Sequence, residues 1–190
     1  MMRLEGEKID LRVWQLNDLE RFVHWQSAEH LWTRFDGPYY PLLAGDDLRK
    51  TVDVLRENIL NQSFPTPYMR LVISDKHKED QLIGIVSASW VSIETAWLDF
   101  GIAIFDEAYW SQGVGYEALT LWSDYLFAQY PHIVRLGLRT WSGNHGMMRL
   151  AEKLGHQLEA RFRQARIVNG TYYDGLAYGI LRSEWEARQR

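Results

Sequence analysis

The 190-residue chain contains no cysteine. Disulfides, thiolate zinc sites and cysteine nucleophiles are therefore excluded, and nothing points to secretion. No apolar run approaches the roughly 20 residues that a membrane-spanning helix needs. The first residues alternate charged and apolar side chains and lack the apolar stretch of a signal peptide. We therefore expect a cytoplasmic protein with no membrane partner and no metal.

An excess of positive charge is missing as well. The chain has 21 Lys and Arg against 25 Asp and Glu, a formal net charge of −4 and a pI near 5.9. Because nucleic-acid binders usually carry a basic field, no nucleic-acid partner is expected. Apolar residues make up 46% of the chain, which is a globular composition, and the length suits one domain over residues 1–190.

The apolar patterning predicts seven strands and four helices in the order βααβββαβαββ. This order indicates an α+β or mixed α/β domain. Asn17 and Glu20 are spaced like a capping box at the first helix. Asn169-Gly170 between two alternating runs is typical of a type I′ hairpin turn. The expected strands cover 9–14, 68–74, 81–91, 96–105, 134–140, 160–168 and 171–181, and the expected helices cover about 17–28, 46–61, 113–129 and 144–155.

A glycine-containing turn, "YWSQGVGYEAL" over residues 109–119, joins a strand to a helix. Glycines let the backbone approach a ligand, and the free amides and dipole of a helix N-terminus favour an anion such as phosphate. The simplest alternative is a tight turn with no ligand. A Walker loop is disfavoured because no Gly-Lys-Ser/Thr follows. A dinucleotide fingerprint is disfavoured because Ala118 stands where its third glycine would be.

A second motif, "NHGMMRLAEKLGH" over residues 144–156, follows one strand later. Asn144 is a good N-cap, and Gly155 is placed to close the helix. Read alone, this segment is an ordinary capped amphipathic helix. Its position directly after the strand that follows the glycine turn is what makes it informative.

Together the two motifs resemble the GNAT superfamily of N-acetyltransferases. The first is similar to that family's pyrophosphate loop, Gln/Arg-x-x-Gly-x-Gly/Ala, and the second to its Asn…Glu-Lys-Leu-Gly-Phe helix. The opening "IDLRVWQLNDLERFVHW" and the closing "YYDGLAYGILRSEW" resemble the RimJ/RimL-like branch. The resemblance implies a largely antiparallel central sheet that is splayed at the cofactor site and flanked by about four helices.

Three departures from the family pattern matter for function. Trp110 stands where the loop has Gln or Arg, and Met147 replaces a frequent Ser. Ala151 occupies the position where many members carry a tyrosine that protonates the leaving thiolate. That general acid therefore has no counterpart at this position.

The resemblance implies an acetyl-CoA-dependent N-acetyltransferase in which a primary amine, on a protein N-terminus or a small molecule, attacks the thioester directly in a ternary complex. Loop amides would hold the pyrophosphate, strand backbone would bind the pantetheine arm, and an asparagine would reach the pantetheine or the phosphates. The cofactor-binding residues expected on this basis are Ile102, Ala103, Ile104, Gln112, Gly113, Val114, Gly115, Tyr116 and Asn144.

Proton transfer and acceptor binding are harder to assign. Asp99 is the strand carboxylate closest to the expected thioester and is the candidate general base, with a salt-bridged structural aspartate as the alternative. Fold analogy places the acceptor pocket at the first helices and the "RFDGPYY" loop. Its candidate residues are Trp14, Trp32, Phe35 and Tyr39.

Two other functional classes remain open from the residues. The missing tyrosine is compatible with a non-catalytic acyl-CoA-binding or sensory module, and the Gly-x-Gly turn alone is compatible with a nucleotide-binding module. The acceptor can be a protein N-terminus, a polyamine, an aminoglycoside or an amino acid. The chain is expected to act as a monomer or a homodimer.

Overall fold

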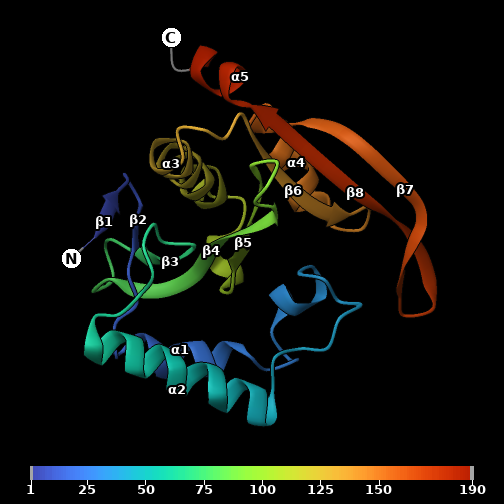
Figure 1. Ribbon diagram of the computed structural model, residues 1–190. Coiled ribbons are helices and arrows are strands. Elements are labelled where there is room, and N and C mark those ends of the chain that lie inside the picture. Colours follow the sequence, from blue (N-terminus) through green and yellow to red (C-terminus); the bar gives the residue numbers. More distant parts are fainter. Residues whose placement is uncertain (1, 189–190) are drawn as a thin grey trace.

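The computed structural model describes residues 2–188 and contains one eight-stranded sheet with the strand order β1-β2-β3-β4-β5-β6-β8-β7 (Figure 1). Neighbouring strands are antiparallel except for β5 and β6, which are parallel. The expected mixed fold with a largely antiparallel sheet is thereby confirmed. The strands are β1 (Arg3–Glu5), β2 (Ile9–Arg12), β3 (Arg70–Asp75), β4 (Gln81–Ser92), β5 (Trp97–Ile104), β6 (Arg135–Trp141), β7 (Gln157–Val168) and β8 (Thr171–Leu181).

Helices lie on both faces of this sheet, α1 and α2 on one side and α3 and α4 on the other (Figure 1). The helices are α1 (Asp18–Trp25), α2 (Gly45–Asn61), α3 (Val114–Gln129), α4 (His145–Lys153) and α5 (Arg182–Ala187). Two short 3₁₀ helices, η1 (Leu31–Arg34) and η2 (Glu107–Tyr109), lie in loops. Among residues 2–188, none of the helices combines the length and the apolar character needed to cross a bilayer.

Each face of the sheet has its own apolar core, because successive strand residues point to opposite sides. In β3, Leu71 and Ile73 pack with α3 and α4, whereas Val72 packs with α1 and α2. α3 is apolar around most of its circumference, and eight of its side chains are buried. Such a helix must be covered on several sides, which fits its contacts with β2, β4, β5 and α4.

The long hairpin of β7 and β8 extends beyond the rest of the molecule (Figure 1). Asn169 and Gly170 connect its strands with φ values of 50° and 76°, as the predicted type I′ turn requires. A bulge between Phe162 and Arg166 interrupts the pairing. Asp174 lies opposite this bulge, where it accepts hydrogen bonds from Arg161 and from the Gln164 amide, both at 2.9 Å.

Several boundaries differ from those predicted. β1 and α5 are additional elements, and the first long strand ends at Arg12 instead of residue 14. The capping box at Asn17 is wrong: Asn17 has helical φ and ψ, and its side chain makes no cap hydrogen bond. Asp18 organises this turn instead. It accepts the Gln15 amide at 2.7 Å and forms a buried ion pair with Arg12 at 2.7 Å.

Candidate active site

β5 and β6 separate near the middle of the sheet. They pair only at Leu98 with Leu136 and at Asp99 with Gly137, although β5 continues to Ile104 and β6 to Trp141. The later residues of β5 stay paired with β4 on their other side. One edge of β5 therefore opens onto a gap between two strands of the same sheet, as expected for a splayed cofactor site.

The direction of the β4–β5 hydrogen bonds decides which residues face this gap. The Phe105 amide donates to the Ile83 carbonyl at 2.9 Å, so it points toward β4. Because an antiparallel ladder alternates, the backbone of Ala103 also points toward β4, whereas the backbones of Ile102 and Ile104 point into the gap. The Ile104 carbonyl already accepts the Trp110 indole N–H at 3.0 Å. Of the three predicted pantetheine residues, Ile102 thus offers its backbone most directly.

The predicted glycine turn meets α3 at the end of the gap. Gly113 is the N-cap of α3 with φ of 85°, a left-handed conformation that favours glycine. The Glu117 amide donates to the Gly113 carbonyl at 3.0 Å. The preceding amides of Val114, Gly115 and Tyr116 belong to the first turn, where a helix supplies no internal acceptor. These donors and the positive end of the helix dipole fit a phosphate group.

Gly115 has a different role from the one its motif suggests. A Cβ atom added there would lie 3.1 Å from Cδ2 of Leu150 in α4 and 3.5 Å from Cδ1 of Ile104 in β5. Gly115 therefore lets α3, α4 and β5 pack closely. Close packing at Gly115 and the left-handed backbone at Gly113 together place the first turn of α3 against the open edge of β5.

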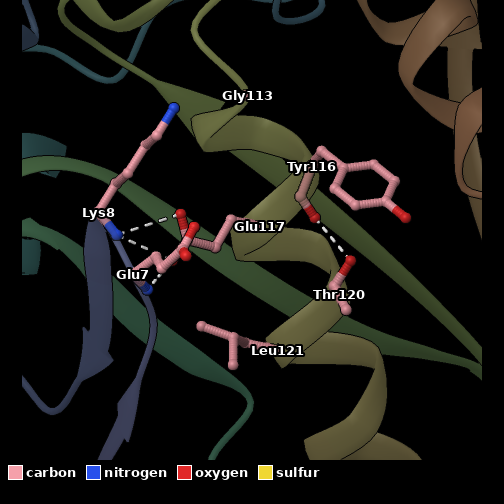
Figure 2. Close-up of a pocket in the computed structure, with 7 residues that line it drawn as sticks. All are labelled: Glu7, Lys8, Gly113, Tyr116, Glu117, Thr120 and Leu121. Atoms are coloured by element: carbon pink, nitrogen blue, oxygen red, sulfur yellow. Dashed lines mark hydrogen bonds between the residues drawn. The ribbon is translucent and has the colours of Figure 1, made fainter. Parts of the chain in front are cut away.

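The turn between β1 and β2 contacts the first turn of α3 and holds it in place (Figure 2). The Glu117 carboxylate accepts the backbone amides of Glu7 and Lys8. The Lys8 ammonium donates to the Gln112 carbonyl at 2.7 Å. A cavity of about 310 Å³ lies here, and it is lined by Glu7, Lys8, Gly113, Tyr116, Glu117, Thr120 and Leu121. No sequence motif marks Lys8 as a site residue, because the turn at residues 6–8 is about a hundred residues from the glycine turn.

Replacing Gly113 by valine is expected to weaken acetyl-CoA binding at least about tenfold. A β-branched residue in the left-handed region costs roughly 1–2 kcal/mol, and relaxing it would displace the first-turn amides. Isothermal calorimetry measures the effect. Gly170→Val is the matched control, since Gly170 is also left-handed but has no atom within 4 Å of an added Cβ and lies in the distal hairpin. Equal affinities for both variants would contradict the role of Gly113.

Asn144 caps α4, as predicted. Its Oδ1 accepts the Met147 amide at 3.0 Å, and its Nδ2 donates to the Phe35 carbonyl at 3.2 Å. The Trp141 indole N–H donates to the same carbonyl at 2.9 Å. The segment around Phe35 is thus anchored to the end of β6 and to the start of α4. It therefore lies on the β6 side of the gap.

Replacing Asn144 by alanine is expected to destabilise the protein by about 0.5–2 kcal/mol, because α4 loses its cap. The same change removes one of the two donors to the Phe35 carbonyl. Urea unfolding measures the stability, and Asn144→Asp, which keeps an acceptor for the Met147 amide, is the control. If Asn144 also binds the cofactor, acetyl-CoA affinity falls at temperatures where the alanine variant is fully folded. Unchanged affinity would leave capping as its role.

Asp99 lies at the point where β5 and β6 separate. Its Oδ1 accepts the Trp97 indole N–H at 3.0 Å, and its Oδ2 accepts Arg139 Nε at 2.9 Å. The side chain is 14% exposed. An added Cβ at Gly137 would collide with the carboxylate, so Gly137 makes the room that Asp99 occupies. Asp99 is therefore a salt-bridged strand residue, and each oxygen keeps one further lone pair for an acceptor amine or a water.

The four predicted acceptor residues do not lie together. Trp14 and Trp32 are 2% and 7% exposed and pack in the core between the sheet and α1 and α2. Phe35 and Tyr39 lie in the loop after η1, next to Trp110, which packs at the edge of the same core, and next to Trp141 of β6. Phe35 makes an edge contact with the Trp110 ring at 5.6 Å, and Tyr39 faces Trp141 at 6.4 Å. Sequence spacing did not reveal this aromatic cluster, because Trp110 and Trp141 come from distant segments.

His156 follows α4 and stands where the family pattern has phenylalanine. It is 4% exposed, its ring lies against Phe100 of β5 at 5.4 Å, and neither ring nitrogen has a hydrogen-bond partner among the described residues. Burial, together with the charge of Arg188, lowers the pKa of His156 to about 4. Because this pKa lies well below neutral pH, the histidine occupies its site as a neutral ring.

Ala151, in α4, is fully buried and carries no titratable group, so the tyrosine acid of many relatives has no counterpart there.

Comparisons with known proteins agree with this arrangement. Residues 8–157 match the acetyltransferase (GNAT) domain family. The SPbeta prophage-derived uncharacterized N-acetyltransferase YokL of Bacillus subtilis is 22% identical over 95% of this chain and 94% of its own length. A GNAT-family acetyltransferase from Bacillus anthracis superposes with a TM-score of 0.73 at 18% identity, covering 96% of this chain and all of that one.

A further solved structure, the RimL ribosomal L7/L12 alpha-N-protein acetyltransferase in complex with coenzyme A, superposes with a TM-score of 0.70 at 18% identity. It covers 95% of this chain and 98% of the other. At these identities the structural likenesses show the fold, while the family match covers most of the chain, including the gap and both predicted motifs. The chain therefore belongs to the acetyltransferase (GNAT) family and is an acetyl-CoA-dependent acyltransferase.

Proposed function

We propose that the protein, as one domain over residues 1–190, transfers an acetyl group from acetyl-CoA to a primary amine by direct attack in a ternary complex. The acceptor amine belongs to a protein N-terminus or a small molecule. The observation that carries this proposal is the meeting of two features at one place. The free first-turn amides of α3 lie next to the open edge of β5, which suits a ligand with phosphates at one end and an amide-containing arm at the other.

On the cofactor side, the amides of the turn from Gln112 to Tyr116 hold the pyrophosphate. The backbone of Ile102 hydrogen-bonds the pantetheine arm, in the manner of an added strand. Ala103 and Ile104 shape the edge of β5, and Asn144 lies at the start of α4 on the opposite side of the gap. These assignments are supported by the strand register and by the family to which the chain belongs.

Acetyl-CoA supplies a thioester whose carbonyl carbon accepts the amine nitrogen. The N–C bond forms, the C–S bond breaks, and the amine loses one proton. The Ile102 amide, aimed into the gap, stabilises the negative charge that develops on the thioester oxygen. Thiols have a pKa near 8.5, so the thiolate is a fair leaving group and takes its proton from water in the absence of a tyrosine at position 151.

Asp99 accepts the amine proton, directly or through a water. It is the carboxylate that lies where the strands separate, on the face of the sheet that carries Arg139. The acceptor approaches from this face, past Phe35 and Tyr39. Trp14 and Trp32 stabilise the core beneath this region, because their burial leaves almost no surface for a substrate. The likeness to RimL supports the RimJ/RimL-like branch.

A non-catalytic acyl-CoA-binding module is the second candidate, and one observation favours it. Ala151 is buried where many relatives carry their general acid, so cofactor binding can persist without efficient turnover. This module and the transferase share the glycine turn and the gap. They differ only in whether the acetyl group leaves the cofactor.

A panel of amine acceptors assayed for release of free CoA tests the proposed function. The panel contains peptides with free N-termini, polyamines, aminoglycosides and amino acids. The transferase predicts CoA release that depends on one acceptor class and saturates with its concentration. Release no faster than acceptor-free hydrolysis in every case, together with tight acetyl-CoA binding, would favour the non-catalytic module.

A further inference from the structure

Three cations from three different elements surround the first turn of α3. Lys8 comes from the β1–β2 turn, Lys153 from the last turn of α4, and Arg188 follows α5. All three side chains are exposed. Within the part of the chain that the structure describes, none of them forms an ion pair with a carboxylate. Their charge is therefore available to an anionic ligand.

Lys153 and Arg188 both contact Tyr116, whose amide is one of the free first-turn donors. The Lys153 ammonium lies 4.7 Å from the centre of the Tyr116 ring, and Arg188 Nη2 lies 3.4 Å from the Tyr116 hydroxyl. Arg188 also donates to the Lys153 carbonyl at 3.0 Å and stacks on the Trp185 ring. Two like charges on one ring repel each other, and a bound dianion would replace that repulsion with attraction.

Lys8 lies on the opposite side of the same turn. Its side chain runs toward Gly113 and away from the Glu117 carboxylate, whereas the Tyr116 ring points to the other side of α3 (Figure 2). The ammonium donates to the Gln112 carbonyl and lies 3.9 Å from the position of a Cβ at Gly113. Glu117 fixes the backbone of Lys8 without neutralising its ammonium. Lys8 is thus held beside the residues that would carry the pyrophosphate.

We propose that these three side chains form a basic collar with two anion subsites for the phosphates of the cofactor. Lys8 binds the pyrophosphate from outside the glycine turn. Lys153 and Arg188, which both contact Tyr116, bind the 3′-phosphate of the cofactor. They thereby discriminate CoA from its dephosphorylated form. This inference rests on the proposed function, because it assumes that the pyrophosphate lies at the first turn of α3. It assigns binding to side chains of β1–β2, α4 and the C-terminal segment, outside the glycine turn.

The collar is tested by calorimetry with three ligands: acetyl-CoA, acetyl-dephospho-CoA and acetyl-pantetheine. Lys153→Met and Arg188→Met are each expected to weaken acetyl-CoA binding about five- to tenfold, with little effect on the dephosphorylated ligand. Lys8→Met is expected to weaken both phosphorylated ligands and to leave acetyl-pantetheine unchanged. Each effect shrinks as salt is added, because exposed charges are screened. Lys76→Met is the matched control, since Lys76 donates to the Gly6 carbonyl of the same turn at 2.9 Å.

A purely structural role for these cations predicts a different pattern. Arg188 and Lys153 would then only stabilise the C-terminal end of α4. Their loss would lower the melting temperature and weaken the binding of all three ligands equally. Arg188→Lys and Lys153→Arg, which keep the charge, restore discrimination between CoA and dephospho-CoA only if the collar binds phosphate. Equal affinity of wild type and every charge-removing variant for acetyl-CoA would overturn the collar. Failure of wild type to bind any of the three ligands would instead overturn the proposed function.

Discussion

Replacing Asp99 by asparagine is expected to lower kcat by about 10²–10⁴-fold, the range typical for loss of a general base. The amide cannot take the amine proton, although it has nearly the same shape as the carboxylate. Acetyl-CoA affinity is expected to stay unchanged, because Asp99 contacts Trp97 and Arg139 and not the glycine turn. Steady-state kinetics and calorimetry on the folded variant measure the two effects separately.

Asp174→Asn is a matched control for this experiment. Asp174 is also a sheet aspartate whose two oxygens accept from an arginine and from an N–H group, but it lies at the bulge of the β7–β8 hairpin. A few-fold loss of kcat in both variants would show that Asp99 is only a structural ion pair. The pH–rate profiles add a second criterion, because a true base loses its acidic limb in Asp99→Asn. An acidic limb of the same shape and height in both enzymes would assign the proton to another group.

Acidification is expected to destabilise the protein through His156. Its pKa is lowered from an ordinary value of 6.5 to about 4, chiefly by burial. Between these two values the unfolded chain binds a proton that the folded chain does not, so stability is present above about pH 6.5 and is lost as the pH falls toward 4. Since one pKa unit corresponds to about 1.4 kcal/mol, the loss attributable to His156 is about 3 kcal/mol at pH 4.

His156→Phe is the variant that isolates this contribution, because phenylalanine fills the site against Phe100 and does not titrate. Urea unfolding of both proteins at neutral pH and near pH 4.5 gives the difference. Wild type is expected to lose more free energy of unfolding on acidification than the variant, by roughly 2–3 kcal/mol. Parallel losses in the two proteins would show that His156 is protonated in the folded state or finds a partner there.

Features governed by local chemistry were predicted well from the sequence. The Asn169-Gly170 turn and the Asn144 cap each depend on a few neighbouring residues, and their positions in the structure agree with the prediction. Asn17 is the exception. Its cap is predicted from spacing, but the ion pair of Asp18 with buried Arg12 sets the conformation of that turn.

Features governed by distant pairing were not accessible in the same way. The partner of Asp99 is 40 positions away on β6, and the carbonyl of Phe35 meets Trp141 and Asn144 more than 100 positions away. Aromatic residues carry no sequence signal that separates core from site, so the sequence groups Trp14 and Trp32 with Phe35 and Tyr39 as acceptor candidates. Only the packing of α1 and α2 on the sheet shows that the two tryptophans are buried.

Single-turnover transfer from acetyl-CoA labelled in its acetyl group tests the central claim most directly. The enzyme is held in excess over the labelled cofactor, and peptides with free N-termini, polyamines, aminoglycosides and amino acids are offered in separate reactions. The proposed mechanism predicts that, in at least one reaction, the label moves from CoA to an amine nitrogen in one exponential phase. It also predicts that Gly113→Val slows this phase at a subsaturating protein concentration. Label that stays on CoA in every reaction, while calorimetry shows the cofactor bound, would contradict catalysis and leave an acyl-CoA-binding module.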